Sequence, residues 1–488
     1  MKSKVVRHII YSLIFTFLNG FLAFYINRVF GDNLGQGNLG ILKLFTQLVA
    51  YLNLSELGVS AASAAILYKL FNENNYIKIK DVFKTIDFFY SRIAAGIFFL
   101  GLILLVFIPS LVSEPCNNIY FIWCLYVVAT SSSYLYAKYV IIFSSDQNYE
   151  YVQLVKNSVK ISIQILQIIS LKYFQSFEIF VCLLVFGNFF EYIFYYIFFK
   201  ANYKLKLSNY KASINDNYLI KSTKQVFVHK IAGVLVLNTD YIVIAKFIGI
   251  KTVAIYSSYI MVYQFINLFL SNVILVIKPK IGLLVGKSSK DEVKKIWDIM
   301  YIISFFVASN IIFVFFVNIN FFINLWMGND YLLSQLTVLL ITINVFIEII
   351  RKPIDIIKDV SGYFKDIHLP IIEGLFNLIT SIILAIYIGL NGVIIGTLIS
   401  NILIILLMKP YVVYKDIFHF SFFDYIFRTV KYIMMSIIVF YISWNIIGYL
   451  AINDLIMFII SPFISLLVSM VIFYFDIMSV IKLRKIND

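Results

Sequence analysis

The sequence of 488 residues is 61% hydrophobic and only 14% charged, and its mean hydropathy is +0.90. These values exclude an ordinary soluble fold, and the segments between the apolar runs are too short for a further soluble domain. The net charge of +14 is compatible with a nucleic-acid partner, and the positions of the basic residues along the chain decide whether that interpretation holds.

Apolar runs long enough to cross a bilayer follow one another along the chain, and they predict an all-α integral membrane protein with about 14 transmembrane helices. The first run follows three basic residues, Lys2, Lys4 and Arg7, and this arrangement resembles that of a signal peptide. It lacks a small-residue cleavage site and continues, so we expect an uncleaved first helix. The predicted helices, in chain order, cover 9–30, 39–68, 88–112, 119–143, 152–171, 177–199, 226–248, 253–277, 296–323, 332–357, 369–388, 390–408, 430–450 and 455–475.

The basic residues between these runs predict the topology. If both termini are cytoplasmic, the outside loops contain only Arg28, Lys172 and Lys251, and most other Lys and Arg residues fall in inside segments. This distribution follows the positive-inside rule and supports an even number of helices. It also disfavours a nucleic-acid partner, because basic residues at these positions set topology and lie beside anionic membrane lipids.

A weak internal repeat predicts two pseudo-symmetric halves. Arg28 and Gly31 mark the first outer turn, and Lys246 and Gly249 mark the turn between helices 7 and 8. We therefore expect an N-terminal six-helix lobe at 1–199, a cytoplasmic linker at 200–225 and a C-terminal six-helix lobe at 226–415. The remaining residues, 416–488, add two further helices and a cytoplasmic tail.

Several predicted helices have polar residues along one face, which suggests a shared polar interior. The stripe of helix 5 is the most complete, and it includes Gln153, Asn157, Lys160, Gln164 and Gln167. Other members lie on helices 1, 2, 7, 8, 10 and 11, and they include Asn19, Glu56, Asp240, Asn267, Arg351, Glu373 and Asn377. For any single amide or hydroxyl, the simpler interpretation is a hydrogen bond between helices.

The charged residues inside the predicted helices favour a function more strongly than the amides do. Glu56, Lys160 and Asp240 lie well within their helices, where a cavity or coupling role competes with a structural ion pair. Lys138, Lys156 and several others lie nearer the cytoplasmic ends, from which a long side chain can reach the headgroups. The three cysteines and four histidines have no spacing typical of disulfides, metal sites or redox motifs, so we expect no cofactor and no metal.

Four stretches resemble, in order, the Wzx-type polysaccharide flippases of the multidrug/oligosaccharidyl-lipid/polysaccharide exporter superfamily. They are NRVFGDNLGQGNLGILKLFTQLVAYLNLSELGVSAA near the N-terminus, SSDQNYEYVQLVKN between helices 4 and 5, FVHKIAGVLVLNTDYIVIAKFIGIKTVAIYSSY in helices 7 and 8, and RKPIDIIKDVSGYFKDIHLP with the residues that follow it. The resemblance spans most of residues 10–415. Family members commonly have twelve helices, and the extra pair predicted here is similar to that of the lipid II flippase branch.

The resemblance implies a flippase that moves undecaprenyl-diphosphate-linked oligosaccharide repeat units across the bacterial inner membrane by alternating access. Such units supply O-antigen, lipopolysaccharide, capsule or exopolysaccharide, so a polysaccharide polymerase is an expected partner. Lys138, Lys156, Lys160 and Lys230 are expected to attract the diphosphate on the cytoplasmic side, because phosphate favours cationic donors. Arg28 and Lys246 are expected to receive it on the outer side, and Gln164 and Asn267 are expected to contact the substrate.

Glu56 and Asp240, one in each predicted lobe, are the expected sites of coupling to protons or sodium ions.

The sequence does not exclude two other classes of protein. A cation-coupled multidrug exporter of the same fold is expected to have carboxylates and aromatic walls, whereas this interior has several lysines. A membrane polysaccharide polymerase or ligase is expected to have a sizeable outer loop with catalytic Arg or His, and the predicted outer loops are short.

Overall fold

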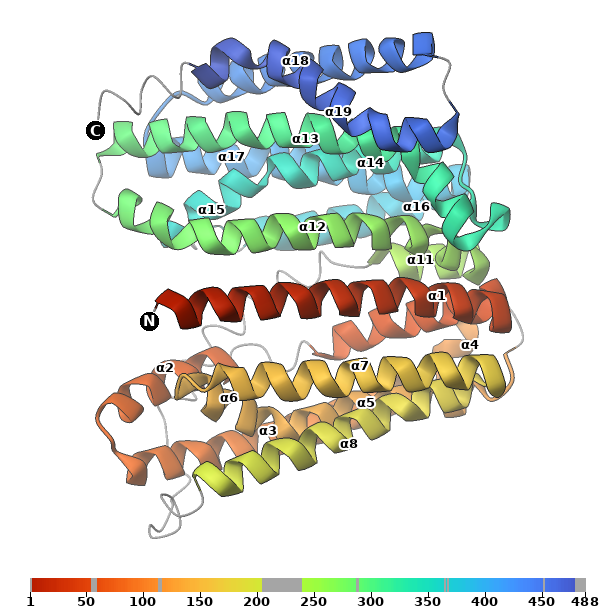
Figure 1. Ribbon diagram of the computed structural model, residues 1–488, viewed down its shortest axis with the longest axis vertical. Coiled ribbons are helices and arrows are strands. Elements are labelled where there is room, and N and C mark those ends of the chain that lie inside the picture. Colours follow the sequence, from red (N-terminus) through yellow and green to blue (C-terminus); the bar gives the residue numbers. More distant parts are fainter. Residues whose placement is uncertain are drawn as a thin grey trace. The chain divides into compact units, whose positions relative to one another are not determined.

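The computed structural model describes residues 2–53, 59–112, 116–203, 239–286, 289–363, 366, 368–450 and 453–478. All regular elements within these residues are helices. Nine of the described helices are long and apolar enough to cross a membrane. The chain is therefore an all-α, multi-pass membrane protein, and the fold class predicted from the sequence is confirmed (Figure 1).

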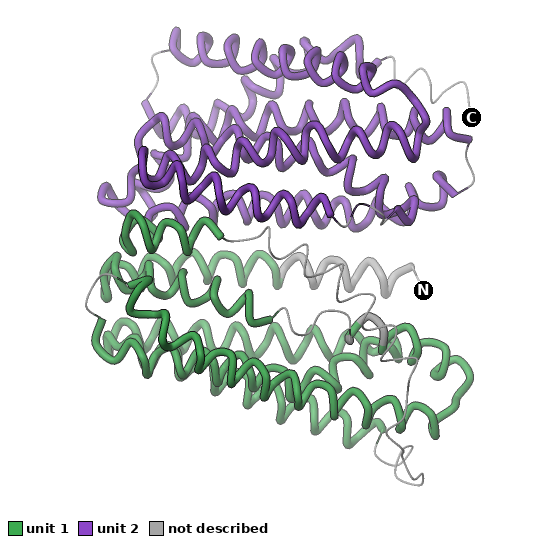
Figure 2. The backbone as a smooth tube through the Cα atoms, turned by 180° about the vertical axis from the view of Figure 1, so that it is seen from behind, with its two compact units in different colours: residues 1–254 green, residues 255–488 purple. Residues whose placement is uncertain are grey.

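The chain forms two compact units, residues 1–254 and residues 255–488 (Figure 2). Unit 1 contains the helices α1 to α8 and α11, and unit 2 contains α13 to α19 together with most of α12. The proposed linker at 200–225 lies mostly outside the described residues, so the division into six-helix lobes stays a prediction.

Unit 1 begins with α1 (Lys2–Leu52), which joins two helices at a kink. Gly35, with φ of 81°, breaks the helix between the first two predicted spans, and this left-handed conformation favours glycine. The other helices of the unit are α2 (Val59–Asn72), α3 (Tyr76–Leu104), α4 (Ile108–Leu111), α5 (Ile119–Ser133), η2 (Tyr134–Tyr136), α6 (Ala137–Ser145), α7 (Tyr149–Tyr173), α8 (Phe177–Asn202) and α11 (Thr239–Phe247).

The core of unit 1 forms where α7 packs against α1 and α8, and where α5 packs against α3 and α8. Phe45 of α1 is fully buried, and its ring meets the edge of Trp123 at a centroid distance of 4.9 Å. The Trp123 indole donates a hydrogen bond of 2.8 Å to the carbonyl of Gly101 on α3. This contact satisfies a polar group that would otherwise lie unpaired in an apolar core.

Unit 2 is arranged around α13 (Lys290–Met327), which packs against α14, α18 and α19. Its N-terminus has a capping box, in which Ser289 and Glu292 satisfy each other's backbone N–H groups. The other elements are α12 (Ile250–Val285), η3 (Asn329–Tyr331), α14 (Gln335–Ile350), α15 (Lys352–Val360), α16 (His368–Ser400), η4 (Asn401–Met408), α17 (Lys409–Val412), η5 (Val413–Phe418), α18 (Phe422–Leu450) and α19 (Asp454–Ile472).

Two interruptions in unit 2 follow from local sequence. The predicted span 332–357 is divided into α14 and α15 at Arg351, two residues before Pro353, because proline cannot donate the hydrogen bond that would continue the first helix. Within α16, Gly389 has φ of 62° and separates the predicted spans 369–388 and 390–408. The chain after this turn continues through the wide π-helical turns of η4 and η5.

Candidate functional site

The polar stripe of α7 mainly joins this helix to its neighbours in unit 1. Asn19 of α1 donates to Asn157 across 3.3 Å, and Asn157 donates to Gln153 across 3.0 Å. Gln164 is 7% exposed and donates to the Asn19 carbonyl, while Gln167 donates to the Phe180 carbonyl on α8. These amides hold helices together, and in this conformation Gln164 has little surface left for a substrate.

Two lysines of the same helix differ from the amides, because both are exposed. Lys156 and Lys160 lie one turn apart on α7 and repel each other, and the carboxylate of Glu191 on α8 attracts both. Glu191 is partly buried and is in hydrogen-bonding contact with Tyr136. One carboxylate offsets only one of the two ammonium charges, so this part of unit 1 keeps a positive charge that can attract an anion.

Lys138, the third described lysine that the sequence predicts on the cytoplasmic side, is already paired. The Lys138 ammonium on α6 lies 2.5 Å from a carboxylate oxygen of Asp87 on α3, and the Lys138 side chain is 14% exposed. The ammonium also lies 5.2 Å from the centroid of the Tyr139 ring. Asp87 directly precedes the predicted span 88–112, and nothing in the local sequence signals that it meets a residue 51 positions later.

The two cations predicted at the outer turns also have partners within unit 1. The Arg28 guanidinium on α1 lies 2.6 Å from the Asp32 carboxylate, one helical turn later. Lys246, in the last turn of α11, donates to the Ser110 carbonyl of α4 across 2.9 Å. Both side chains are partly or well exposed, so these contacts are weak and an anionic ligand can compete with them.

The predicted coupling residues are described in part. Asp240 lies in the first turn of α11, is partly buried, and acts electrostatically on Tyr51 of α1 and on Tyr241. Glu56 and Lys230 lie outside the described residues. The structure therefore places Asp240 beside α1 within unit 1, where its carboxylate faces a tyrosine.

The interior of unit 2 contains a network of paired charges. Arg351 contacts Glu348 at 2.9 Å and Asp355 at 3.0 Å, and the Lys409 ammonium contacts the Glu373 carboxylate at 2.8 Å. The Lys409 and Glu373 side chains are only 7% and 3% exposed. The sequence patterns include Arg351 and Glu373 but miss Lys409, because a lysine at the end of an apolar run looks like a topological signal.

Asn267, the predicted substrate residue in unit 2, belongs to the edge of this network. Its side-chain oxygen on α12 accepts a hydrogen bond of 2.7 Å from the Lys352 ammonium on α15. Lys352 is also close to Glu348 and Asp355. In this conformation the amide of Asn267 positions a cation, and it shares that cation with two carboxylates.

The last two helices are attached to α13 by small polar side chains. Asn310 on α13 donates to Ser469 on α19 across 2.9 Å and accepts from Ser465 at the same distance. Asn318 donates to Ser461 across 2.7 Å, and Ser309 donates to Ser436 of α18 across 2.8 Å. Serine at the contact lets helices approach closely and supplies hydrogen bonds that lipid cannot.

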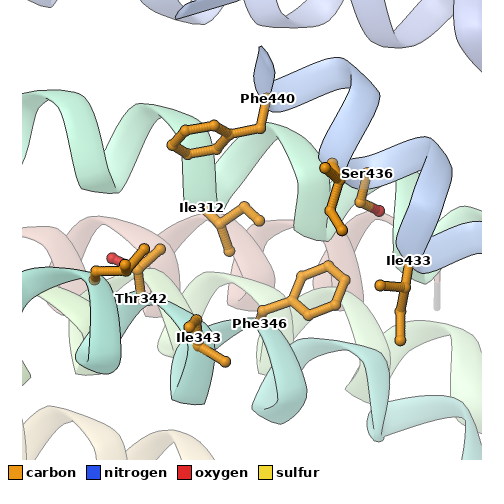
Figure 3. A pocket seen from close by; sticks show the side chains of 9 residues that line it. Ile312, Thr342, Ile343, Phe346, Ile433, Ser436 and Phe440 are labelled. Atoms are coloured by element: carbon orange, nitrogen blue, oxygen red, sulfur yellow. The ribbon is translucent and has the colours of Figure 1, made fainter.

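An apolar cavity of about 360 Å³ lies beside these contacts, between α13, α14 and α18 (Figure 3). Side chains of Ile312, Phe346 and Phe440 line it, and a second cavity of about 590 Å³ shares Ile437 and Phe440. The hydroxyl of Thr342 in the first cavity donates to its own helix. The walls therefore suit a hydrocarbon better than a sugar.

No protein-family model and no curated protein matches this chain. Solved structures do match it. The lipid II flippase MurJ in an inward closed conformation has a TM-score of 0.65 and 16% identity, and the match covers 96% of this chain and all of that one.

An inward-facing multidrug resistance MATE family transporter of the MOP superfamily has a TM-score of 0.57 and 12% identity, over 80% of this chain and 93% of that one. The Vibrio cholerae MATE transporter VcmN in the bent form has a TM-score of 0.53 and 12% identity, over 84% and 97%. At these identities the likeness shows a shared fold. The chain is a multi-pass membrane protein with the fold of these transporters.

Proposed function

We propose that this protein is a flippase for undecaprenyl-diphosphate-linked oligosaccharide repeat units in the bacterial inner membrane, where it serves O-antigen, capsule or exopolysaccharide synthesis. The observation that supports this most is the pair of exposed lysines on α7, which share one carboxylate at the level of the predicted membrane spans. A cation at this depth is costly unless water or an anionic ligand stabilises it. The diphosphate of a lipid-linked sugar is an anion of this kind.

The amphipathic cargo has three parts that need different surroundings. The diphosphate contacts Lys156 and Lys160, with Lys138 and Lys230 as further cytoplasmic-side cations, and Arg28 and Lys246 receive it near the outer turns. Gln164 and Asn267 contact the sugar in conformations that release their present hydrogen bonds. The apolar cavity between α13, α14 and α18 suits the hydrocarbon tail, which needs no polar partner.

Transport proceeds by alternating access between two six-helix lobes, and an ion gradient drives it. Asp240 and Glu56 are the proposed coupling carboxylates for protons or sodium ions. A partly buried carboxylate such as Asp240 can change its charge with its surroundings, and it can thereby favour one conformation over another.

A cation-coupled multidrug exporter is the second candidate function, because MATE transporters have this fold. Such a protein has to attract cationic drugs, and carboxylates or aromatic rings serve this better than ammonium groups. The positive balance of Lys156, Lys160 and Glu191 therefore favours an anionic cargo over a cationic one.

Deletion of the gene, followed by analysis of the lipid-linked glycans, tests the proposal. The deletion strain should lack one surface polysaccharide and accumulate its undecaprenyl-diphosphate-linked unit on the cytoplasmic face of the membrane. Expression of the intact chain should restore both to wild-type levels. A strain that exports every surface glycan normally but becomes sensitive to cationic drugs would support the exporter instead.

A further inference from the structure

The second part of α1, after the break at Gly35, has two different faces. Leu44 and Phe45 are fully buried in the core of unit 1, and Phe45 packs on Trp123 and Tyr126. The opposite face contains polar residues at intervals close to whole helical turns. They are Gln36, Lys43, Gln47 and Tyr51, and none of the four is fully buried.

Lys43 is the charged member of this face. Among the described residues, no side chain forms an ion pair or a hydrogen bond with its ammonium, and no described charge lies close enough to act on it. This differs from Lys138, Arg28 and Lys409, each of which contacts a carboxylate. Lys43 is also partly buried, so bulk water surrounds only part of it.

The position of Lys43 prevents it from escaping to the membrane surface. It lies eight residues after the break at Gly35, which corresponds to roughly 12 Å along a helix that rises 1.5 Å per residue. An extended lysine side chain spans only about half that distance. Its charge therefore stays at the depth of the apolar run, where it requires either water or an anion.

A close helix contact fixes the backbone beside Lys43. One turn toward the outer end, Gly40 packs so tightly against the start of α12 that an added Cβ would lie 2.0 Å from the Ile250 carbonyl oxygen. The polar face continues inward from Lys43 to Tyr51, which lies near the carboxylate of Asp240. Lys43 is thus held on a rigid helix, between a fixed contact and the predicted coupling residue.

We infer that Lys43 is a phosphate-binding residue of the outer half of the transport path in unit 1, and that it contacts the diphosphate of the lipid carrier. The inference rests on the proposed function and assigns to it a residue outside the predicted set. Lysine suits this task because its ammonium is a compact charge with three donors, and it can follow a phosphate that changes position. Lys246 lies in the last turn of α11 and already has a partner, so the diphosphate meets Lys43 before it reaches Lys246. Arg28 lies seven residues before Gly35, at a depth similar to that of Lys43, and it is paired with Asp32.

Binding of undecaprenyl diphosphate to the purified full-length protein tests this inference, with native mass spectrometry as the readout. Lys43→Gln should weaken binding at least tenfold, and Lys43→Arg should stay within about threefold of wild type because it keeps the charge. Lys78→Gln, at an exposed lysine in the first turn of α3, is the matched control and should bind like wild type. A thermal unfolding curve for each variant separates a loss of binding from a loss of fold.

The same measurement with inorganic diphosphate separates two sources of the anion. A dependence on Lys43 for both ligands shows that the residue recognises the diphosphate group itself, whereas a dependence confined to the lipid shows recognition of the lipid-linked form. If Lys43→Gln binds both ligands as well as wild type, the role of Lys43 is refuted while the flippase proposal stands. If the wild-type protein binds no undecaprenyl diphosphate, the proposed function fails as well.

Discussion

In unit 1, Lys156 and Lys160 share the single carboxylate of Glu191, whereas in unit 2 Arg351 and Lys409 each contact a carboxylate within 3.0 Å. Both units have the polar interior that the sequence predicts, but they use it differently. A network of balanced charges holds helices in place, while an excess of one charge attracts a ligand of the opposite charge. We therefore propose that the cations of unit 1 bind the diphosphate and that the paired charges of unit 2 have a structural role.

Reversal of one charge in unit 1 has the largest expected effect. Lys160→Glu removes one ammonium group and places a second carboxylate near Lys156, in addition to that of Glu191. The net charge of this group of three residues changes from positive to negative. Surface polysaccharide should fall at least 100-fold, while the amount of protein in the membrane stays the same. Immunoblots of the glycan and of the membrane fraction measure both quantities. Lys160→Arg is the control and should retain export, and unchanged export in the Lys160→Glu strain would refute the diphosphate role.

Removal of one partner from an ion pair in each unit compares the contributions of the two pairs to the stability of the protein. Lys409→Met leaves Glu373 buried without its cation and should destabilise the protein by about 3–5 kcal/mol, whereas Asp87→Asn at the more exposed pair should cost less than about 1 kcal/mol. Thermal unfolding in detergent compares the variants. The double variant Lys409→Met with Glu373→Gln should recover most of the loss, and equal effects of the two single variants would contradict the comparison.

The coupling proposal concerns one residue of unit 1. Asp240→Asn removes the charge but keeps the size of the side chain, so transport should continue at a rate several-fold lower and should no longer respond to a gradient. Uptake into vesicles with an imposed pH or sodium gradient measures this response. Asp291→Asn, at an exposed carboxylate in the first turn of α13, is the matched control. A variant that responds to both gradients like wild type would exclude Asp240 as the coupling site.

A smaller effect is expected where α18 and α19 attach to α13. Asn310→Leu removes three hydrogen bonds to serines of α19 and should lower stability by roughly 0.6–1.7 kcal/mol. Asn445→Leu, whose amide bonds only within α18 and is exposed, should have no measurable effect. Unfolding curves that do not distinguish these variants would show that apolar packing alone holds the last two helices.

The smallest expected effect lies at the outer end of unit 1. Burial, and then the charge of Glu178, raises the pKa of the Cys116 thiol. A raised pKa leaves less thiolate near neutral pH, so alkylation should be several-fold slower than for free cysteine and should accelerate as the pH rises. A membrane-impermeant maleimide added outside intact spheroplasts measures this rate. Labelling only after lysis would place Cys116 on the cytoplasmic side and would contradict the predicted topology.

The fold was largely predictable from sequence, because hydropathy and charge position are local signals. The break at Gly35 and the division at Gly389 both fall between predicted spans. Partners distant in sequence were not predictable. Helical periodicity identifies the face on which Lys138 or Gln164 lies, but it cannot identify Asp87 or the Asn19 carbonyl as the group that this face meets. Lys43 was missed although Gln36, Lys43, Gln47 and Tyr51 recur at helical spacing, because the sequence does not show that its ammonium has no partner among the described residues.

Translocation by the purified protein in liposomes tests the central claim most directly. An undecaprenyl-diphosphate oligosaccharide with a fluorescent sugar is placed in both leaflets, and loss of its signal to an external quencher or glycosidase reports its movement. The wild-type protein should make nearly all of the labelled lipid accessible, while the double variant Lys156→Gln with Lys160→Gln should leave about half protected. Equal accessibility with the wild-type protein, the double variant and protein-free liposomes would contradict the claim that this chain moves lipid-linked glycans.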